Sequence, residues 1–308
     1  MIAPVPARPR RLAYLGNPEV AVPPLRALAG SAAALGIEVV AVVTSEPRRR
    51  GRRADPTPTP VAAVATEIGI DVVHDLDDLN GLGVDLGVVV AYGRLLSVQL
   101  LARIPMVNLH FSLLPRWRGA APVERALLAG DTETGVCIMD LAEGLDTGGV
   151  RARTTTPIGP HETADDLRDR LADLAADLLV GWLDGLIADG PDEPEPQLGE
   201  PTWAHKLGRD DLRLDWGQPA AELHRLVRVG GAHTTYRGES LKVWAAEIVP
   251  QVGGSAGVTA PGVLVDDVVA TSDGGLRLVK VQAAGRARMT FGAWSLGARP
   301  HPDERLGD

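Results

Sequence analysis

Short apolar runs alternate with segments of helical periodicity along the chain as far as residue 189. In the helical segments apolar residues recur every three or four positions, whereas each short run is almost uniformly apolar, as in a strand buried on both faces. The runs that predict strands are Leu12–Leu15, Ile37–Val43, Asp71–Val73, Leu86–Ala91, Met106–Leu109, Gly135–Leu141 and Gly149–Thr156. Strands that alternate with helices predict an α/β fold built on a mostly parallel sheet.

A change of composition near residue 190 predicts a domain boundary. A helix predicted from about Thr163 to Ala188 ends just before Gly190–Pro201, a stretch rich in Pro, Gly and acidic residues that is typical of a linker. Beyond it, a predicted helix near Pro219–Val229 precedes short alternating segments separated by glycine-rich turns, which predict a small β-barrel. The expected domains are residues 1–189 and 206–308, joined by a linker over 190–205.

The composition predicts a globular protein of about two domains. Of the 308 residues, 45% are hydrophobic and 23% are charged, which excludes disorder throughout the chain. The single cysteine, Cys137, has no partner for an intramolecular disulfide and forms no thiolate cluster for zinc. Since Met1–Arg11 has no apolar signal-peptide core and no apolar run could span a bilayer, we expect a soluble cytoplasmic protein without a membrane or metal site.

The usual anchors of several enzyme classes are missing. The first predicted turn between strand and helix reads Gly16-Asn17-Pro18-Glu19 and lacks the glycines with which a dinucleotide fold admits pyrophosphate. The sequence has no P-loop, no HExxH and no Gly-x-Ser-x-Gly. Nicotinamide, flavin, nucleotide-triphosphate, zinc-protease and serine-hydrolase functions are therefore disfavoured.

Candidate chemistry is concentrated in Val107–Gly119, which begins where a predicted buried strand ends. Asn108 and His110 are two residues apart, so both side chains project to the same face of an extended chain. Asp146 lies in a glycine-flanked loop between two predicted strands and could reach His110. These three groups suit acyl transfer to an amine, because Asn108 can donate to an oxyanion while His110, oriented by Asp146, moves a proton. Each residue alone fits strand-end capping or a turn hydrogen bond equally well.

The run from Asn108 to Pro122, together with Gly135 and Leu145–Gly148, closely resembles the folate-dependent formyltransferases, and the similarity covers nearly the whole chain. It implies a Rossmann-like formyltransferase domain, an OB-like C-terminal barrel and 10-formyltetrahydrofolate as co-substrate. The resemblance assigns catalysis to Asn108, His110 and Asp146. It assigns folate contacts to Val90, Ala91, Tyr92, Gly93, Ser112, Leu113, Leu114 and Pro115.

Two features resemble the branch of this family that acts on methionyl-tRNA. Thr44–Pro60 is similar to the loop that enters the acceptor arm, and Thr202–Leu207, with Lys206, is similar to the start of the tRNA-binding domain. The cations of the loop, suited to phosphates, are Arg48, Arg49, Arg50, Arg52 and Arg53. The resemblance implies formyl transfer to initiator methionyl-tRNA for translation initiation, by a monomer without an obligate protein partner.

Two alternatives stay open from the sequence: formyl transfer to an amino-sugar nucleotide, and a non-catalytic folate- or RNA-binding module. The net charge of -9 speaks against indiscriminate nucleic-acid binding. However, residues 161–200 alone hold 12 acidic and 2 basic residues, so the acidity is local. An RNA held along selected basic surfaces is compatible with this distribution.

Overall fold

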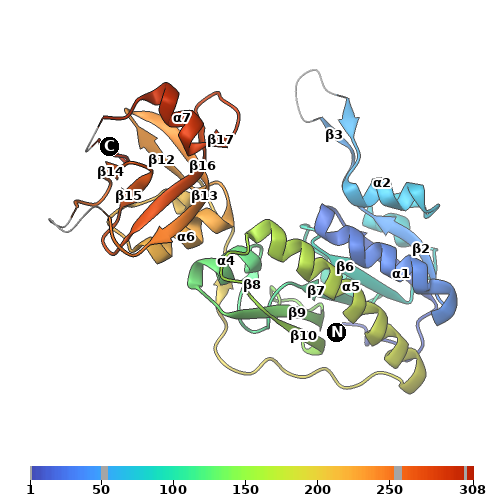
Figure 1. The fold of residues 1–308 in the computed structure, drawn as a ribbon. Helices are drawn as coiled ribbons and strands as arrows, with labels where there is room; N and C mark the ends of the chain where they lie inside the picture. The colour runs from blue at the N-terminus through green and yellow to red at the C-terminus, as the bar shows by residue number, and fades with distance from the viewer. Residues whose placement is uncertain (1, 50–54, 253–258, 302–303) are drawn as a thin grey trace. The chain divides into compact units, whose positions relative to one another are not determined.

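The structure is a computed structural model of the chain and describes residues 2–49, 55–252, 259–301 and 304–308 (Figure 1). It contains two compact units. The first unit comprises residues up to Val123, Glu133–Pro157 and Leu167–His205, and the second comprises Glu124–Thr132, Ile158–Asp166 and Lys206–Asp308.

A seven-stranded sheet forms the centre of the first unit, with strand order β10-β9-β7-β6-β1-β2-β5. Its strands are β1 (Arg11–Gly16), β2 (Glu38–Val43), β5 (Val72–Val73), β6 (Leu86–Val90), β7 (Met106–His110), β9 (Glu133–Asp140) and β10 (Val150–Pro157). The neighbours from β5 to β7 pair in parallel, and β9 pairs antiparallel with both β7 and β10. The predicted mostly parallel sheet is therefore confirmed.

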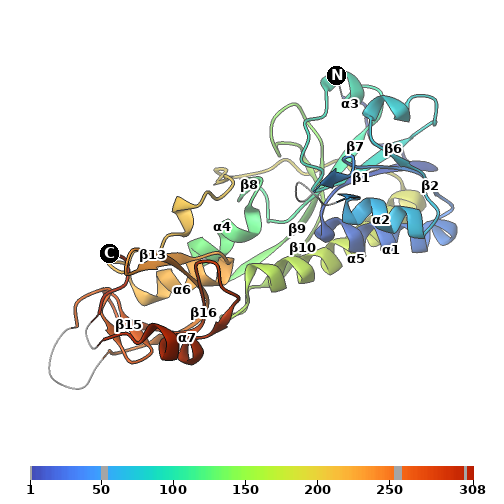
Figure 2. The ribbon, with the colours of Figure 1, turned by 90° about the horizontal axis from the view of Figure 1, so that it is seen from above.

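Helices cover both faces of this sheet. Figure 2 shows α1 (Val22–Leu35) and α5 (Ala164–Asp189) on one side and α3 (Val98–Leu101) on the other. This unit also contains α2 (Pro60–Glu67) and the short 3₁₀ turns η1 (Glu19–Ala21) and η2 (Leu76–Leu79), whereas most of α4 (Pro122–Ala129) belongs to the second unit. The sequence sets the ends of α2, because the Thr59 side chain accepts a hydrogen bond from the Ala62 amide at the N-terminus, with Pro60 in the first helical turn.

The chain order of the strands places a topological switch point between β1 and β6. From β1 the chain builds outward through β2 to β5, then returns to the other side of β1 for β6 and β7. Open α/β sheets bind ligands at the carboxyl ends of the strands beside such a point. Here those ends carry Asn17, whose Oδ1 accepts from the Thr44 hydroxyl and the Ser45 amide, and whose Nδ2 donates to the Tyr92 carbonyl.

The second unit contains an antiparallel sheet with the order β12-β13-β16-β15-β14, to which β17 adds by pairing with β16. The strands are β12 (His233–Tyr236), β13 (Glu239–Val249), β14 (Leu264–Val265), β15 (Val268–Ala270), β16 (Gly275–Ala283) and β17 (Met289–Thr290). Helices α6 (Ala220–Val229) and α7 (Phe291–Ala298) and the 3₁₀ turn η3 (Asp210–Leu212) complete it. Its core buries Trp216, Leu223, Phe291 and Trp294.

The expected fold class, an α/β domain plus a separate antiparallel β domain, is confirmed, whereas the expected boundaries at 189 and 205 stay predictions. Short pairings were not predicted: β3 (Arg48–Arg49) pairs with β4 (Pro56–Thr57), and β8 (Arg118–Gly119) with β11 (Trp203–Ala204). Within the described residues, no helix is long and apolar enough to cross a membrane.

Candidate active site

Asn108 and His110 lie on one face at the end of β7. Their partners on the neighbouring strand β9 are Met139 and Cys137, and directly paired residues share a face of the sheet. His110 is buried, with 5% of its side chain exposed, whereas Asn108 is half-buried. The expected projection of both side chains to one face therefore agrees with the pairing.

The segment after β7 folds back over this face. Leu114 is buried in a cluster with Cys137 and Met139. Leu113 packs so closely on Gly135 that a Cβ there would lie 2.7 Å from the Leu113 Cδ2 and 2.0 Å from the Thr154 carbonyl oxygen. Position 135 therefore has to be glycine for the strand and this segment to approach.

Asp146 reaches His110 from the loop between β9 and β10. Its backbone is left-handed, with φ of 52°, which is uncommon for a residue with a side chain. The carboxylate is 11% exposed; its Oδ2 accepts a hydrogen bond of 2.8 Å from the Gly119 amide and lies 3.6 Å from His110 Nδ1. A nearly buried carboxylate requires such partners.

The other nitrogen of His110 is already engaged. Nε2 lies 2.8 Å from the main-chain carbonyl oxygen of Trp117, which can only accept, so Nε2 carries a proton. Trp117 itself is left-handed, with φ of 64°. Nδ1, which faces Asp146, is therefore the ring nitrogen that can take up or release a proton.

The Asn108 side chain makes no hydrogen bond to another residue in the part of the chain that the structure describes. Because no buried polar side-chain atom lacks a partner there, this amide is accessible. It can donate to a ligand that reaches the face of β7 beside the proton-exchanging Nδ1. One donor beside one proton carrier can stabilise a developing oxyanion and transfer a proton.

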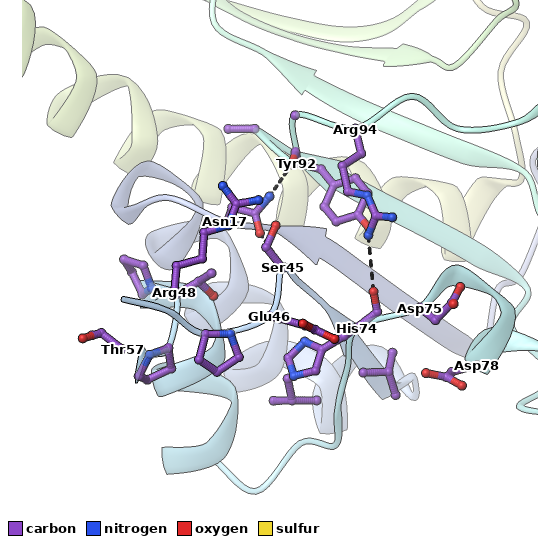
Figure 3. Close-up of a pocket in the computed structure, with 18 of the residues that line it drawn as sticks. Asn17, Ser45, Glu46, Arg48, Thr57, His74, Asp75, Asp78, Tyr92 and Arg94 are labelled. Atoms are coloured by element: carbon purple, nitrogen blue, oxygen red, sulfur yellow. Dashed lines mark hydrogen bonds between the residues drawn. The ribbon is translucent and has the colours of Figure 1, made fainter. Parts of the chain in front are cut away.

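A separate pocket of about 1340 Å³ lies at the switch point (Figure 3). Its walls are the turns after β1, β2 and β6 and the β3–β4 hairpin, and neither Asn108, His110 nor Asp146 lines it. Three guanidinium groups, those of Arg48, Arg49 and Arg94, line it together with Glu46, Asp75 and Asp78.

Hydrogen bonds fix one wall of this pocket. Figure 3 shows the Arg94 guanidinium against the ring of Tyr92 and reaching the His74 carbonyl at 3.3 Å. The His74 ring in turn places Nδ1 3.0 Å from the Thr44 carbonyl oxygen. Cationic and acidic groups therefore surround a preformed opening large enough for part of a substrate.

Comparisons with known proteins match the chain over most of its length. A family described as formyl transferase matches residues 10–183, and its C-terminal domain matches residues 206–299. The methionyl-tRNA formyltransferase of Thermobifida fusca (strain YX) is 43% identical over 317 residues, covering 97% of this chain and 99% of the relative. That of Ruegeria pomeroyi is 40% identical over 293 residues, covering 90% and 93%. The chain belongs to the methionyl-tRNA formyltransferase family.

The fold comparison agrees with this membership. HypX from Aquifex aeolicus in complex with tetrahydrofolic acid has a TM-score of 0.63 at 18% identity, over 96% of this chain and 48% of that one. Membership makes the chain an enzyme, a formyltransferase, so the non-catalytic module considered from the sequence is not supported.

In this formyltransferase, the segments predicted to contact folate follow two adjacent parallel strands, β6 and β7. Val90 and Tyr92 are buried, whereas Ala91 and Gly93 are exposed with left-handed backbones. In the second segment the Ser112 hydroxyl donates a hydrogen bond to the Arg116 carbonyl. The apolar surface there comes from Leu113 and Pro115, because Leu114 is buried in the core.

The residues predicted to bind tRNA lie in different parts of the formyltransferase. Arg48 and Arg49 form the exposed strand β3, whereas Arg50, Arg52 and Arg53 lie outside the described residues. Lys206 is exposed at the start of the second unit. Among the described members of this set, Arg48 and Arg49 are adjacent and both line the pocket.

Sequence reasoning missed a cationic face on the second unit, where Lys242 and Arg288 lie against Trp244 and the exposed Lys280 and Arg286 follow in β16 and the turn after it. The Trp244 ring has the Arg288 guanidinium 3.3 Å and the Lys242 ammonium 5.8 Å from its centroid. Among described residues, none of the four cations is paired with a carboxylate, unlike Arg277 on the same sheet, which lies 3.4 Å from both Glu247 and Asp267. These residues are far apart in the sequence, and the pairing of β13 with β16 brings their segments together.

No cluster of three or more potential metal-ligating side chains occurs in the described ranges. Cys137 is buried, and burial raises the pKa of its thiol, as expected for a core residue.

Proposed function

We propose that this enzyme transfers the formyl group of 10-formyltetrahydrofolate to the α-amino group of initiator methionyl-tRNA. The observation that carries the proposal is the convergence of an accessible amide, Asn108, with the buried pair His110 and Asp146, in a chain about 40% identical to methionyl-tRNA formyltransferases over nearly its whole length.

The first step is attack of the neutral amine on the formyl carbon. The carbonyl oxygen becomes an oxyanion in the tetrahedral intermediate, and the Asn108 side-chain amide donates a hydrogen bond to it. Removing one donor of this kind typically costs about 10²–10³ in kcat. We assign Asn108 this role because its amide has no competing partner among the described residues.

The second step moves a proton from the attacking nitrogen to the folate nitrogen that leaves. His110 Nδ1 accepts the proton while Nε2–H stays bound to the Trp117 carbonyl, and the resulting imidazolium faces the Asp146 carboxylate. Nδ1 then returns the proton as the carbon–nitrogen bond to tetrahydrofolate breaks. No covalent bond to the protein is required.

The two predicted folate segments have the chemistry of a flat heterocycle site. Ala91 and Gly93 expose main chain that can hydrogen-bond ring nitrogens, and Leu113 and Pro115 provide apolar surface beside it. Because the folate is the co-substrate that supplies the formyl group, we expect it beside β6 and β7, where Asn108 and His110 could act on the formyl carbon.

The cationic face of the second unit supports a polyanionic acceptor. Lys242 and Arg288 against Trp244, with the exposed Lys280 and Arg286 in β16 and the turn after it, match phosphates, which bind guanidinium groups bidentately and release counterions on binding. An amino-sugar nucleotide carries too few phosphates to cover this face. The observed surface therefore favours RNA over the smaller acceptor.

The deciding experiment incubates the purified chain with 10-formyltetrahydrofolate and methionyl-tRNA and assays formyl-methionine released from the tRNA. We expect formylation by the wild type, and a loss of about 10³-fold in kcat for His110→Ala with tRNA affinity unchanged. Near-normal turnover by His110→Ala would contradict the assigned mechanism. Formylation of an amino-sugar nucleotide but not of methionyl-tRNA would contradict the assigned substrate.

A further inference from the structure

Gln197 joins the loop that contains Asp146 to the loop that contains Arg118, in addition to the hydrogen bond from the Gly119 amide to the Asp146 carboxylate. Its Nε2 donates to the main-chain carbonyls of Asp146, at 2.9 Å, and Gly148, at 2.7 Å. Its Oε1 accepts from the Arg118 guanidinium, at 3.0 Å from Nε and 2.7 Å from the terminal nitrogen. All four hydrogen bonds that a side-chain amide can make are therefore used.

These two loops are the ones that hold His110. The Asp146 carboxylate faces Nδ1, and Trp117, the residue before Arg118, provides the carbonyl that binds Nε2. The segment of Gln197 also holds Trp117 directly, because the Thr202 hydroxyl accepts a 2.8 Å hydrogen bond from the Trp117 amide. Both neighbours of the imidazole are thus tied to one extended segment.

We propose that Gln197 is a positioning residue for formyl transfer, which fixes the Asp146 loop relative to the Trp117–Arg118 loop so that the His110–Asp146 pair keeps its geometry. The inference rests on the proposed roles of His110 and Asp146. Gln197 touches neither reacting group, so it acts through the Asp146 backbone.

The chemistry of the site requires an amide at position 197. Two carbonyls need donors, and a guanidinium needs an acceptor, on opposite ends of one side chain. In Gln197→Glu the interaction with Arg118 becomes an ion pair, but both donors are lost and a carboxylate oxygen faces the carbonyls of Asp146 and Gly148. This variant therefore keeps one end of the bridge and breaks the other.

The first measurement compares kcat and KM of Gln197→Ala and Gln197→Glu with the wild type. A displacement of about 1 Å of a catalytic group can lower the rate by about 10²-fold, so we expect kcat to fall about 10- to 100-fold in both variants. KM for methionyl-tRNA and for the folate should stay within about threefold, since all the hydrogen-bonding capacity of Gln197 is used within the protein. The control is Glu195→Gln, which removes an exposed ion pair to Arg153 from the same segment and should keep wild-type kcat.

The second measurement is a double-mutant cycle with Asp146→Asn, followed in single turnovers. If Gln197 acts through Asp146, Gln197→Ala should lower the rate less than about twofold in the Asp146→Asn background. An equal loss in both backgrounds would overturn the inference, because it would show a role independent of Asp146. Wild-type kcat in Gln197→Glu, or in a folded Gln197→Ala, would overturn it as well.

Wild-type activity and its loss in Asp146→Asn report on the proposed function, and only the Gln197 variants report on this inference. Thermal unfolding of each variant separates misfolding from misplacement, because Gln197→Glu retains its contact with Arg118 and is expected to melt within a few degrees of the wild type.

Discussion

Gly148 is the position where one added methyl group should disable the site. A Cβ there would lie 1.8 Å from the Asp140 carbonyl oxygen and 2.7 Å from its carbonyl carbon, whereas ordinary contact begins at 3.4 Å. The oxygen belongs to the last residue of β9, which the Gly149 carbonyl and the Arg151 side chain hold in place. Gly148→Ala therefore forces the loop to move by about 1.6 Å, the difference between these separations.

The displaced loop includes Asp146, which lies two residues before Gly148 in the chain. Its carboxylate is held by a hydrogen bond of 2.8 Å from Gly119 and lies 3.6 Å from His110, so a shift of this size removes both interactions. We expect kcat for formylation to fall about 10²-fold, with a destabilisation of about 1–3 kcal/mol from overpacking. Steady-state formylation of methionyl-tRNA and urea denaturation measure the two effects.

The matched control is Gly185→Ala in α5, where an added Cβ meets no atom within 4 Å. This variant should keep wild-type kcat and gain roughly 0.5–1 kcal/mol from helix propensity. A Gly148→Ala enzyme with wild-type kcat would refute the reasoning, because it would show that Asp146 need not hold its observed place.

Two further predictions concern the second unit. Lys242→Gln or Arg288→Gln should weaken tRNA binding and reduce the slope of log Kd against log salt by about 0.7–1. Arg277→Gln, which removes an ion-paired cation, should change the slope less. Equal slopes in all three variants would contradict tRNA binding at the cationic face. Hydrogen bonding to Arg237 lowers the pKa of Glu304 to about 2 from 4.5, so its stabilisation is complete above about pH 4.5 and lost as the pH falls through 2. In Glu304→Gln, acid should therefore lower the urea midpoint less than in the wild type.

The sequence predicted the site well where local pattern determines it. Spacing alone places Asn108 and His110 on one face, and the glycines around Asp146 indicated a loop that could approach closely. The structure confirms that Asp146 reaches His110, because its Oδ2 lies 3.6 Å from His110 Nδ1. Their catalytic roles stay predictions, since geometry alone tests no reaction.

Other features depend on backbone conformations that composition does not encode. The proton on His110 Nε2 follows from the Trp117 carbonyl, which is turned toward the ring by a left-handed backbone at a residue type that rarely adopts one. The cationic face depends on the pairing of β13 with β16, whose register is irregular near Ala245 and sets the exposed Lys280 opposite Ala245. Neither irregularity has a signature in the sequence.

The segment around Gln197 shows where compositional reasoning about linkers fails. Proline, glycine and acidic residues predict little regular structure, and only the two-residue strand β11 and a bridge between Glu195 and Val150 form there. Yet a chain without secondary structure has unpaired amides and carbonyls, and those of Thr202 and Ala204 pair with the loop that contains Trp117. A segment with little regular secondary structure can therefore hold a fixed position. A segment of this kind can order an active site that its composition gives no reason to associate with it.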